Sequence, residues 1–327
     1  MSSLVARFAA NSFWLARYLE RAENLARILH INETYARDKP EGPDWRRMLD
    51  LYADSERFFG THAEANAHSV LQFYILDRYN PTSIVSALIN ARQNARSIRH
   101  LISTEMWTHL NIFYSQLLKM TARDIQFSNL ANTANAIILS CQTFEGIAEG
   151  TLMRGEPWCF YQLGKYIERA DQTTRILDIG YNLLPIGDGN AVTSVQWNVL
   201  LRSVCGYHAY RSRYPCHSGE KDIQQFLLYD PEFPRALELC TRRITVQLRD
   251  MERRHGAQRH SEVERARRTL EFALETGPGN DITPEKMHTF LDRIQILLGD
   301  VTDAVKRTYF VHPPADNMYL GNTGQNQ

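Results

Sequence analysis

Apolar residues recur along most of the chain at intervals of three and four positions, which is the spacing of one face of an α-helix. No segment shows the regular alternation of apolar and polar residues that is typical of a half-buried β-strand. Proline and glycine fall mostly between the periodic segments. The sequence therefore predicts an all-α fold of about a dozen helices. The predicted breaks lie at Pro40–Pro43, Asn80-Pro81, Gly155–Pro157, Pro185–Gly189, Asp230-Pro231 and Thr276–Pro284.

Some positions have the composition of a helix start. Asn80-Pro81 and Asp230-Pro231 each place a good capping residue before a proline, which is favoured in the first helical turn. We therefore expect a helix to begin at each of them. Ser103 or Thr104 is expected to cap another helix through its hydroxyl group. Phe233–Arg235 is expected to open a late helix.

One helical motif occurs twice. Tyr18–Ala22 has the sequence YLERA, and Tyr166–Ala170, 148 positions later, has the sequence YIERA. The match continues downstream, where Arg27–Leu29 corresponds to Arg175–Leu177 at the same offset. Two further pairs follow at nearly the same spacing. They are Trp45 with Trp197, and the proline breaks at Asn80 and Asp230. Such a constant offset predicts an ancient tandem duplication.

The duplication suggests how the chain is divided. We expect a first α-helical repeat over residues 1–156 and a second over residues 157–312, joined at the segment MRGEPW. Both repeats are expected to form one compact and pseudo-symmetric body, because arrays of helices bury their apolar faces against their neighbours. The polar segment 313–327 is expected to be a flexible tail.

The polar residues of the repeated motif gather on one side of a helical wheel. In the first copy these are Arg17, Glu20, Asn24 and Arg27, and the opposite side is rich in leucine and alanine. The corresponding residues of the second copy are Lys165, Glu168, Gln172 and Arg175, with Arg21 and Arg169 at the borders. Because adjacent residues on a helix do not face each other, the Glu-Arg dipeptide is not an ion pair within one helix.

This polar side supports two interpretations. The structural one is a solvated charged face or an ion-pair network that fixes helix register. The functional one is a pocket in which glutamate binds an ammonium group and arginine binds a carboxylate or phosphate. The candidate catalytic residues are Glu20 and Glu168, as general acid and base. The candidate substrate-binding residues are Arg17, Arg21, Arg27, Lys165, Arg169, Arg175, Arg96, Arg99 and Glu105.

Two further segments are rich in arginine. Arg92, Arg96 and Arg99 share one helical face, which indicates either an exposed basic stripe or an anion site. The segment from Arg242 to Arg268 interleaves arginine with aspartate and glutamate, so it is more typical of a solvated helical surface than of a nucleic-acid interface.

Charge and hydropathy exclude several classes of protein. The chain has 37 basic and 37 acidic residues, and this balance argues against a general nucleic-acid binder. No apolar run approaches the roughly 20 residues that span a bilayer, so no membrane association is expected. The N-terminal segment lacks the features of a secretory signal, and a cytoplasmic location is expected.

Cysteine and histidine spacing gives no indication of a metal site. The five cysteines include no CxxC pair, so reduced thiols in the core are expected rather than disulfides or structural zinc. The nearby histidine pairs His62 with His68 and His208 with His217 lack helical chelating spacing. Nucleotide-binding signatures of the GxGxxG and P-loop type are also absent. No cofactor is therefore expected on this chain.

Four separated motifs resemble those of the bacterial alpha-E domain proteins, a helical family named for its Glu-Arg motif. They are FWLARYLERAENLARIL, ARQNARSIRHLISTEMWTHLN, MRGEPWCFYQLGKYIERADQTTRIL and FPRAL, and the resemblance runs from about residue 4 to 312. Lys165 departs from the arginine expected there, which keeps the charge but loses the bidentate fork. Glu20, Arg21, Glu168 and Arg169 carry the family's motif.

The resemblance implies a context for the chain. Alpha-E proteins tend to be encoded beside, or fused to, circularly permuted ATP-grasp proteins of the amidoligase type. Transglutaminase-like proteins, and sometimes a proteasome-like peptidase, are found nearby. The implied role is in a system that forms amide or peptide bonds, with ATP and magnesium held by the ATP-grasp partner.

Three functions follow as hypotheses. The leading one is a helical partner of such a ligase that binds a zwitterionic or anionic amino acid or peptide through a Glu/Arg-lined pocket. The second is an enzyme that acts alone on an acyl or peptidyl intermediate, with Glu20 or Glu168 as general base. The third is a non-catalytic scaffold. The sequence leaves open whether the chain is catalytic and whether it associates with itself.

Overall fold

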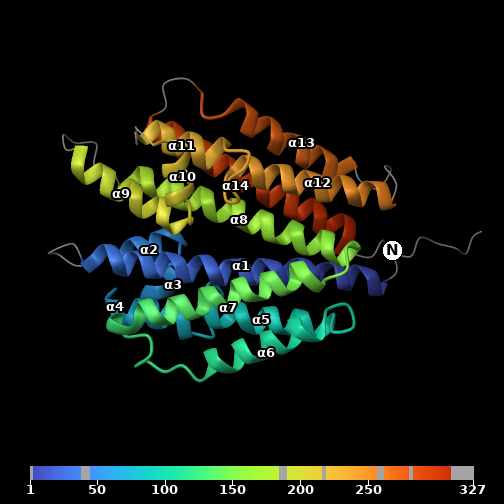
Figure 1. Ribbon diagram of the computed structural model, residues 1–327, viewed down its shortest axis with the longest axis horizontal. Helices are drawn as coiled ribbons and strands as arrows, with labels where there is room; N and C mark the ends of the chain where they lie inside the picture. The colour runs from blue at the N-terminus through green and yellow to red at the C-terminus, as the bar shows by residue number, and fades with distance from the viewer. Residues whose placement is uncertain are drawn as a thin grey trace, which may run out of the picture.

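Two long helices, α1 (Ser3–Arg37) and α8 (Glu156–Leu183), lie side by side through the middle of the molecule (Figure 1). They are part of a computed structural model that describes residues 3–37, 45–183, 190–215, 219–255, 261–279 and 283–310. The described part of the chain is built from helices, with no strand, which confirms the predicted all-α class.

The remaining long helices cover α1 and α8 from two sides (Figure 1). Helices α5 and α7 pack on α1, and α6 packs on both of them from outside. Helices α12 and α14 pack on α8, and α13 packs on both of these. Their bounds are Ile84–Ser97 for α5, Thr104–Leu118 for α6, Leu130–Thr151 for α7, Leu237–His255 for α12, Ser261–Thr276 for α13 and Pro284–Val305 for α14.

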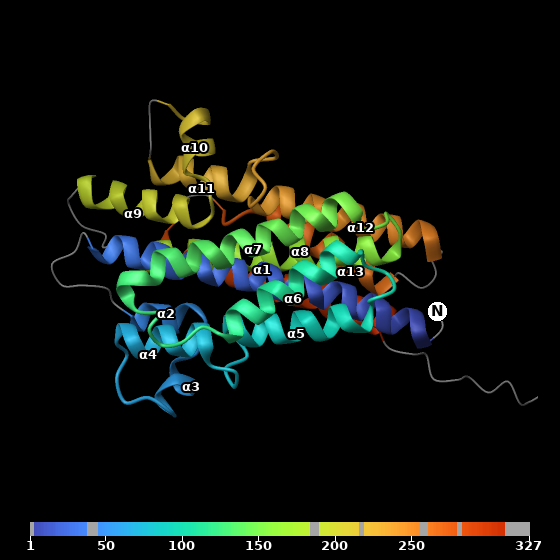
Figure 2. The same cartoon turned by 60° about the horizontal axis from the view of Figure 1, so that its bottom comes forward.

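The other helices lie between these long ones in the sequence or follow them, and most are short (Figure 2). Those between α1 and α5 are α2 (Arg46–Leu51), α3 (Ser55–Phe59), α4 (Ala67–Leu71) and the π-helix η1 (Gln72–Leu76), and the 3₁₀-helix η2 (Phe127–Asn129) precedes α7. Those between α8 and α12 are α9 (Asn190–Ser203), α10 (Tyr207–Arg213) and α11 (Glu220–Tyr229), and the π-helix η4 (Lys306–Phe310) follows α14.

Close packing of α1 against α8 depends on a glycine. The backbone of Gly164 in α8 lies against the carbonyl of Phe13 in α1, and a Cβ atom at residue 164 would overlap that oxygen. Phe13 is itself fully buried and meets Phe310 of η4 edge to face, with ring centroids 5.5 Å apart. The apolar sides of both helices are thereby fixed in one core.

Helix starts were predicted with mixed success. Ser103 caps α6 as expected, because its hydroxyl oxygen accepts a hydrogen bond from the Met106 amide at 3.1 Å. The prediction that a helix begins at Asn80-Pro81 is wrong, since Ser83 is the cap of α5 and the Asn80 side chain accepts instead from the Thr82 amide at 2.9 Å. Asparagine before proline forms a local turn here, three residues ahead of the cap.

The second proline break behaves in the same way. Asp230 ends α11, and its carboxylate accepts hydrogen bonds from the amides of Glu232 and Phe233, both at 2.8 Å. The predicted helix start at Asp230-Pro231 is therefore wrong. Helix α12 begins at Leu237, so Phe233–Arg235 forms the turn that leads into it rather than its first residues.

Three of the four described cysteines agree with the expected core thiols. Cys141, Cys159 and Cys240 are buried and free, whereas Cys205 is free but exposed, in a turn with φ of 59°. That expectation is thus wrong for Cys205. The fifth, Cys216, lies outside the described residues, as does the segment 313–327 that was expected to be a tail.

None of the described helices combines the length and the apolar character that crossing a bilayer requires. The tandem duplication and the boundary between repeats at residue 156 remain predictions. Their main markers, the two Glu-Arg motifs, lie on the two central helices α1 and α8.

Candidate functional site

The Glu-Arg motifs of α1 and α8 face each other and form reciprocal ion pairs. Glu168 of α8 accepts a bidentate pair of hydrogen bonds from Arg21 of α1, at 2.7 and 3.0 Å. Its second oxygen also accepts from Arg17 Nε at 2.7 Å. Glu168 is completely buried, so this carboxylate lies between two arginines of the neighbouring helix.

Glu20 of α1 has the matching arrangement. Its two oxygens accept hydrogen bonds from Arg169 of α8 at 2.9 and 2.8 Å. A second guanidinium, that of Arg235, donates to Glu20 at 2.9 Å and to Asn24 at 2.6 Å. Arg235 lies in the turn before α12, so the network ties that helix to the central pair.

Smaller ion pairs extend both ends of the network. Arg27 pairs with Glu23 at 2.6 Å, and Arg175 pairs with Asp171 at 2.9 Å, each within one helix at a spacing of four residues. Lys165 donates to Glu145 of α7 at 2.5 Å. The structure therefore brings together eight of the eleven residues that the sequence selected. They are Arg17, Glu20, Arg21, Arg27, Lys165, Glu168, Arg169 and Arg175.

The other three selected residues lie elsewhere. Arg96 and Glu105 are exposed on α5 and near the start of α6, and Arg99 is only partly buried. The guanidinium of Arg99 lies over the Trp107 ring, 5.9 Å from its centroid. These residues belong to a separate surface of the α5–α6 pair and not to the network between α1 and α8.

The network changes the acidity of its carboxyl groups. Burial alone would raise the pKa of Glu168, but Arg21 and Arg17 more than offset this and lower it to about 2. Burial and the neighbouring cations Arg169 and Arg235 act in the same opposing way on Glu20, and the pKa of Glu20 is lowered. Both carboxylates therefore remain ionised at neutral pH.

This arrangement is poorly suited to general base catalysis. A base that works near pH 7 needs a pKa near that value and access to the proton it removes. Glu168 has a pKa of about 2, and neither Glu168 nor Glu20 is exposed. Because both carboxylates are buried and paired rather than open to water, the solvated-face interpretation does not fit them, whereas the ion-pair network does.

The Glu168 side of the network retains an accessible positive edge. Arg17, Arg21 and Arg175 outnumber the two carboxylates that they contact, Glu168 and Asp171. The side chains of these arginines are 12%, 25% and 31% exposed. On the Glu20 side the cations are 8–13% exposed, which is less than Arg21 and Arg175 but similar to Arg17.

Aromatic rings border this positive edge. The guanidinium of Arg17 lies 5.2 Å from the centroid of Trp14, and that of Arg21 lies 5.9 Å from Tyr18. Tyr52, between α2 and α3, donates a 3.4 Å hydrogen bond to Gln172 on the same side. We call Arg17, Arg21 and Arg175 the cationic edge. Guanidinium groups are suited to bind a carboxylate or phosphate, and Arg21 and Arg175 are the more exposed members of the edge.

Sequence reasoning missed four charged members of the network, which are Arg235, Glu23, Glu145 and Asp171, the partner of Arg175. Arg235 lies within FPRAL, which was noticed as a motif but not selected as a site residue. Glu23 accepts from Arg27 and from Arg235, and Glu145 from Lys165. Glu23 follows the first motif directly and was detectable by its spacing of four from Arg27, whereas the pairing of Arg235 depends on tertiary structure.

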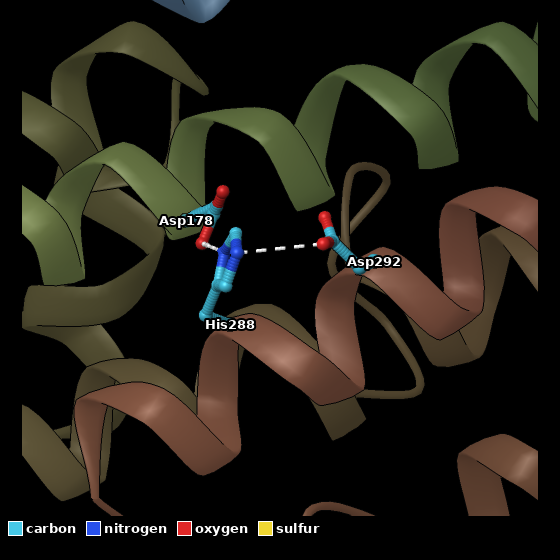
Figure 3. Close-up of side chains that lie close together, drawn as sticks. All are labelled: Asp178, His288 and Asp292. Carbon is cyan, nitrogen blue, oxygen red and sulfur yellow. Dashed lines mark hydrogen bonds and ion pairs between the residues drawn. The ribbon is translucent and has the colours of Figure 1, made fainter.

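The described residues also include one group of side chains with metal-binding chemistry. It consists of Asp178, His288 and Asp292, between α8 and α14 (Figure 3).

Comparisons with known proteins give a family and few relatives. Residues 4–310 match the family model Alpha-E, described as a predicted alpha-helical domain with a conserved ER motif. The chain is 24% identical, over 94% of its length, to an uncharacterized protein of Mycobacterium bovis and to one of Mycobacterium tuberculosis. It covers only 37% of the length of these relatives. No solved structure matches the chain.

Proposed function

The chain belongs to the Alpha-E family, and we propose that it is the helical partner of an ATP-grasp enzyme of the amidoligase type, for which it binds an anionic acceptor at the cationic edge. The family resemblance implies the class of partner. The relatives support a function that needs a second protein or domain, because the region similar to this chain makes up only 37% of their length.

One observation carries the proposal: both motif carboxylates are buried and neutralised by arginine, while the side chains of Arg21 and Arg175 remain 25% and 31% exposed. The carboxylates are thereby occupied and do not take up an ammonium group. An acceptor would be held instead by its carboxylate, and Arg21 and Arg175 provide guanidinium groups for it. This favours an anionic over a zwitterionic mode of recognition at this site.

The stand-alone enzyme is disfavoured by the same geometry. Glu168, with a pKa of about 2, remains bound to two guanidinium groups and is a weak base. Turnover of an acyl or peptidyl intermediate by the purified chain alone, lost in Glu168→Gln under conditions where circular dichroism shows that variant to be folded, would favour that alternative. A scaffold without a binding site predicts instead that neutralising the cationic edge leaves product formation unchanged.

The first test is recovery of the partner. The tagged chain is purified from its native cells after brief crosslinking, and the co-eluting proteins are identified by mass spectrometry. We expect an ATP-grasp protein at near-equal stoichiometry, and ATP-dependent amide formation by the recombinant pair that exceeds that of the ATP-grasp protein alone. The proposal is wrong if the ATP-grasp protein is absent from the crosslinked material and forms product equally fast without this chain.

A further inference from the structure

Three side chains with metal-binding chemistry converge between α8 and α14 (Figure 3). His288 Nδ1 lies 2.7 Å from a carboxylate oxygen of Asp178, and His288 Nε2 lies 3.4 Å from one of Asp292. One donor atom from each residue lies within 4.8 Å of the others. The group therefore joins two helices that are far apart in the sequence.

The backbone holds these residues in place. His288 and Asp292 are four positions apart on α14, so they project from the same face of that helix. The start of α14 is fixed by Thr283, whose hydroxyl accepts from the Lys286 amide at 3.3 Å, and by a proline in the first turn. Between the two ligands, Phe290 and Leu291 are buried in the core.

We propose that Asp178, His288 and Asp292 form a binding site for a divalent cation of the zinc type. The donor set of one imidazole and two carboxylates suits borderline divalent metals, and the two negative charges balance the dication. In a tetrahedral zinc site, ligand atoms lie roughly 3.4 Å apart, given bonds of about 2.1 Å. Asp178 faces Nδ1 of His288 and Asp292 faces Nε2, so one carboxylate must turn towards the nitrogen that binds the ion. The three donor atoms already lie within 4.8 Å of one another.

Three protein ligands leave a coordination position for water or for a ligand oxygen. The side chains of His288 and Asp292 are 47% and 51% exposed, so the cation and such a ligand have access from solvent. Asp178 lies three residues beyond Arg175 on α8, and the site is thus about one helical turn from the cationic edge. The proposal does not depend on the function proposed for that edge.

A proton is the competing occupant. With His288 charged, both ring nitrogens donate to carboxylates, and the same three residues form an ion-paired bridge without a metal. The histidine pairs considered in the sequence did not include this group, because Asp178 is 110 residues away from His288. Only the i, i+4 spacing of His288 and Asp292 was visible in the sequence.

The test is a titration of the chelator-stripped full chain with Zn²⁺ at pH 7.5, followed by calorimetry. We expect one saturable site per chain, at least tenfold weaker binding in His288→Ala and in Asp178→Asn, and unchanged binding in the control Asp303→Asn. Asp303 is exposed on the same helix and pairs only with Lys306 among the interactions seen, so its variant controls for loss of surface charge.

Two further measurements keep the result decisive. Asp292→Asn changes an exposed side chain and is expected to fold, which circular dichroism verifies, while still weakening Zn²⁺ binding. Co²⁺ is expected to give visible absorption bands of a low-coordinate site in the native chain and none in His288→Ala. The proposal is wrong if the native chain does not bind Zn²⁺, or if it binds Zn²⁺ no more tightly than His288→Ala and Asp292→Asn. The three residues would then be only a proton-bridged ion pair.

Discussion

At the scale of single residues, the central feature is a pair of buried, ionised glutamates whose ion pairs hold neighbouring helices together. Glu168 and Glu20 each accept hydrogen bonds from two guanidinium groups outside their own helix. A buried charge is stabilising only while its partners are present, because its desolvation is costly. The sequence identified these residues by repetition, yet it could not tell a network from a pocket, because that depends on which groups the fold brings opposite them.

Replacing Glu168 is expected to destabilise the fold strongly. In Glu168→Gln the two arginines keep a hydrogen-bond acceptor but lose the negative charge, which costs about 3–5 kcal/mol of unfolding free energy. Urea denaturation measures the change. The control is Arg268→Gln, which removes an exposed i, i+4 pair and is expected to cost about 0.5 kcal/mol or less. Equal losses in the two variants would contradict the assigned role of Glu168.

Acid is expected to destabilise the chain through the same group. The folded-state pKa of Glu168 is about 2, below the value of about 4.3 in an unfolded chain. The stability that the ionised Glu168 carboxylate adds to the fold is therefore fully present above pH 5. It is lost as the pH falls from about 4.3 towards 2. Urea midpoints measured between pH 7 and pH 3 are expected to fall less steeply in Glu168→Gln than in the native chain. An identical slope in both would assign the acid sensitivity to other groups.

At the scale of elements, the hydrophobic pattern was sufficient to predict the helices but not all of their ends. A cap at Ser103 or Thr104 was expected because a hydroxyl side chain is favoured at a helix start, and the structure has Ser103 as the cap. At Asn80 and Asp230 the same reasoning failed, because each side chain bonds to amides two or three residues ahead and forms a turn. Capping residues also favour turns, so the pattern alone does not distinguish the two.

The packing of α1 on α8 provides a prediction at this scale. Gly164→Ala is expected to cost about 1–3 kcal/mol of unfolding free energy, because the added methyl group meets the Phe13 carbonyl and must separate the helices. Gly146→Ala is the matched control, since nothing lies within 4 Å of a Cβ atom there. That helical substitution is expected to be neutral or to stabilise by about 0.5–1 kcal/mol. Similar effects in both variants would show that the close contact does not matter.

At the scale of the whole molecule, the arrangement places the Glu-Arg network at the centre. It leaves Arg21 and Arg175, on the Glu168 side, more exposed than any cation on the Glu20 side. Helix α7 and the turn before α12 supply Glu145 and Arg235 to the Glu20 side. No sequence pattern predicts this difference, because the two motifs are nearly identical and only tertiary packing distinguishes them. The accessible side is the one that we assign to an anionic acceptor.

The most direct test of that assignment is the steady-state kinetics of the reconstituted pair with Arg175→Gln. Arg175 is the most exposed residue of the cationic edge, at 31%, and pairs with Asp171 within its own helix, so its loss leaves the central network intact. We predict about a tenfold higher KM for the acceptor, equivalent to about 1.4 kcal/mol, with kcat unchanged and with Arg268→Gln behaving as the native chain. An unchanged acceptor KM in Arg175→Gln would contradict the account.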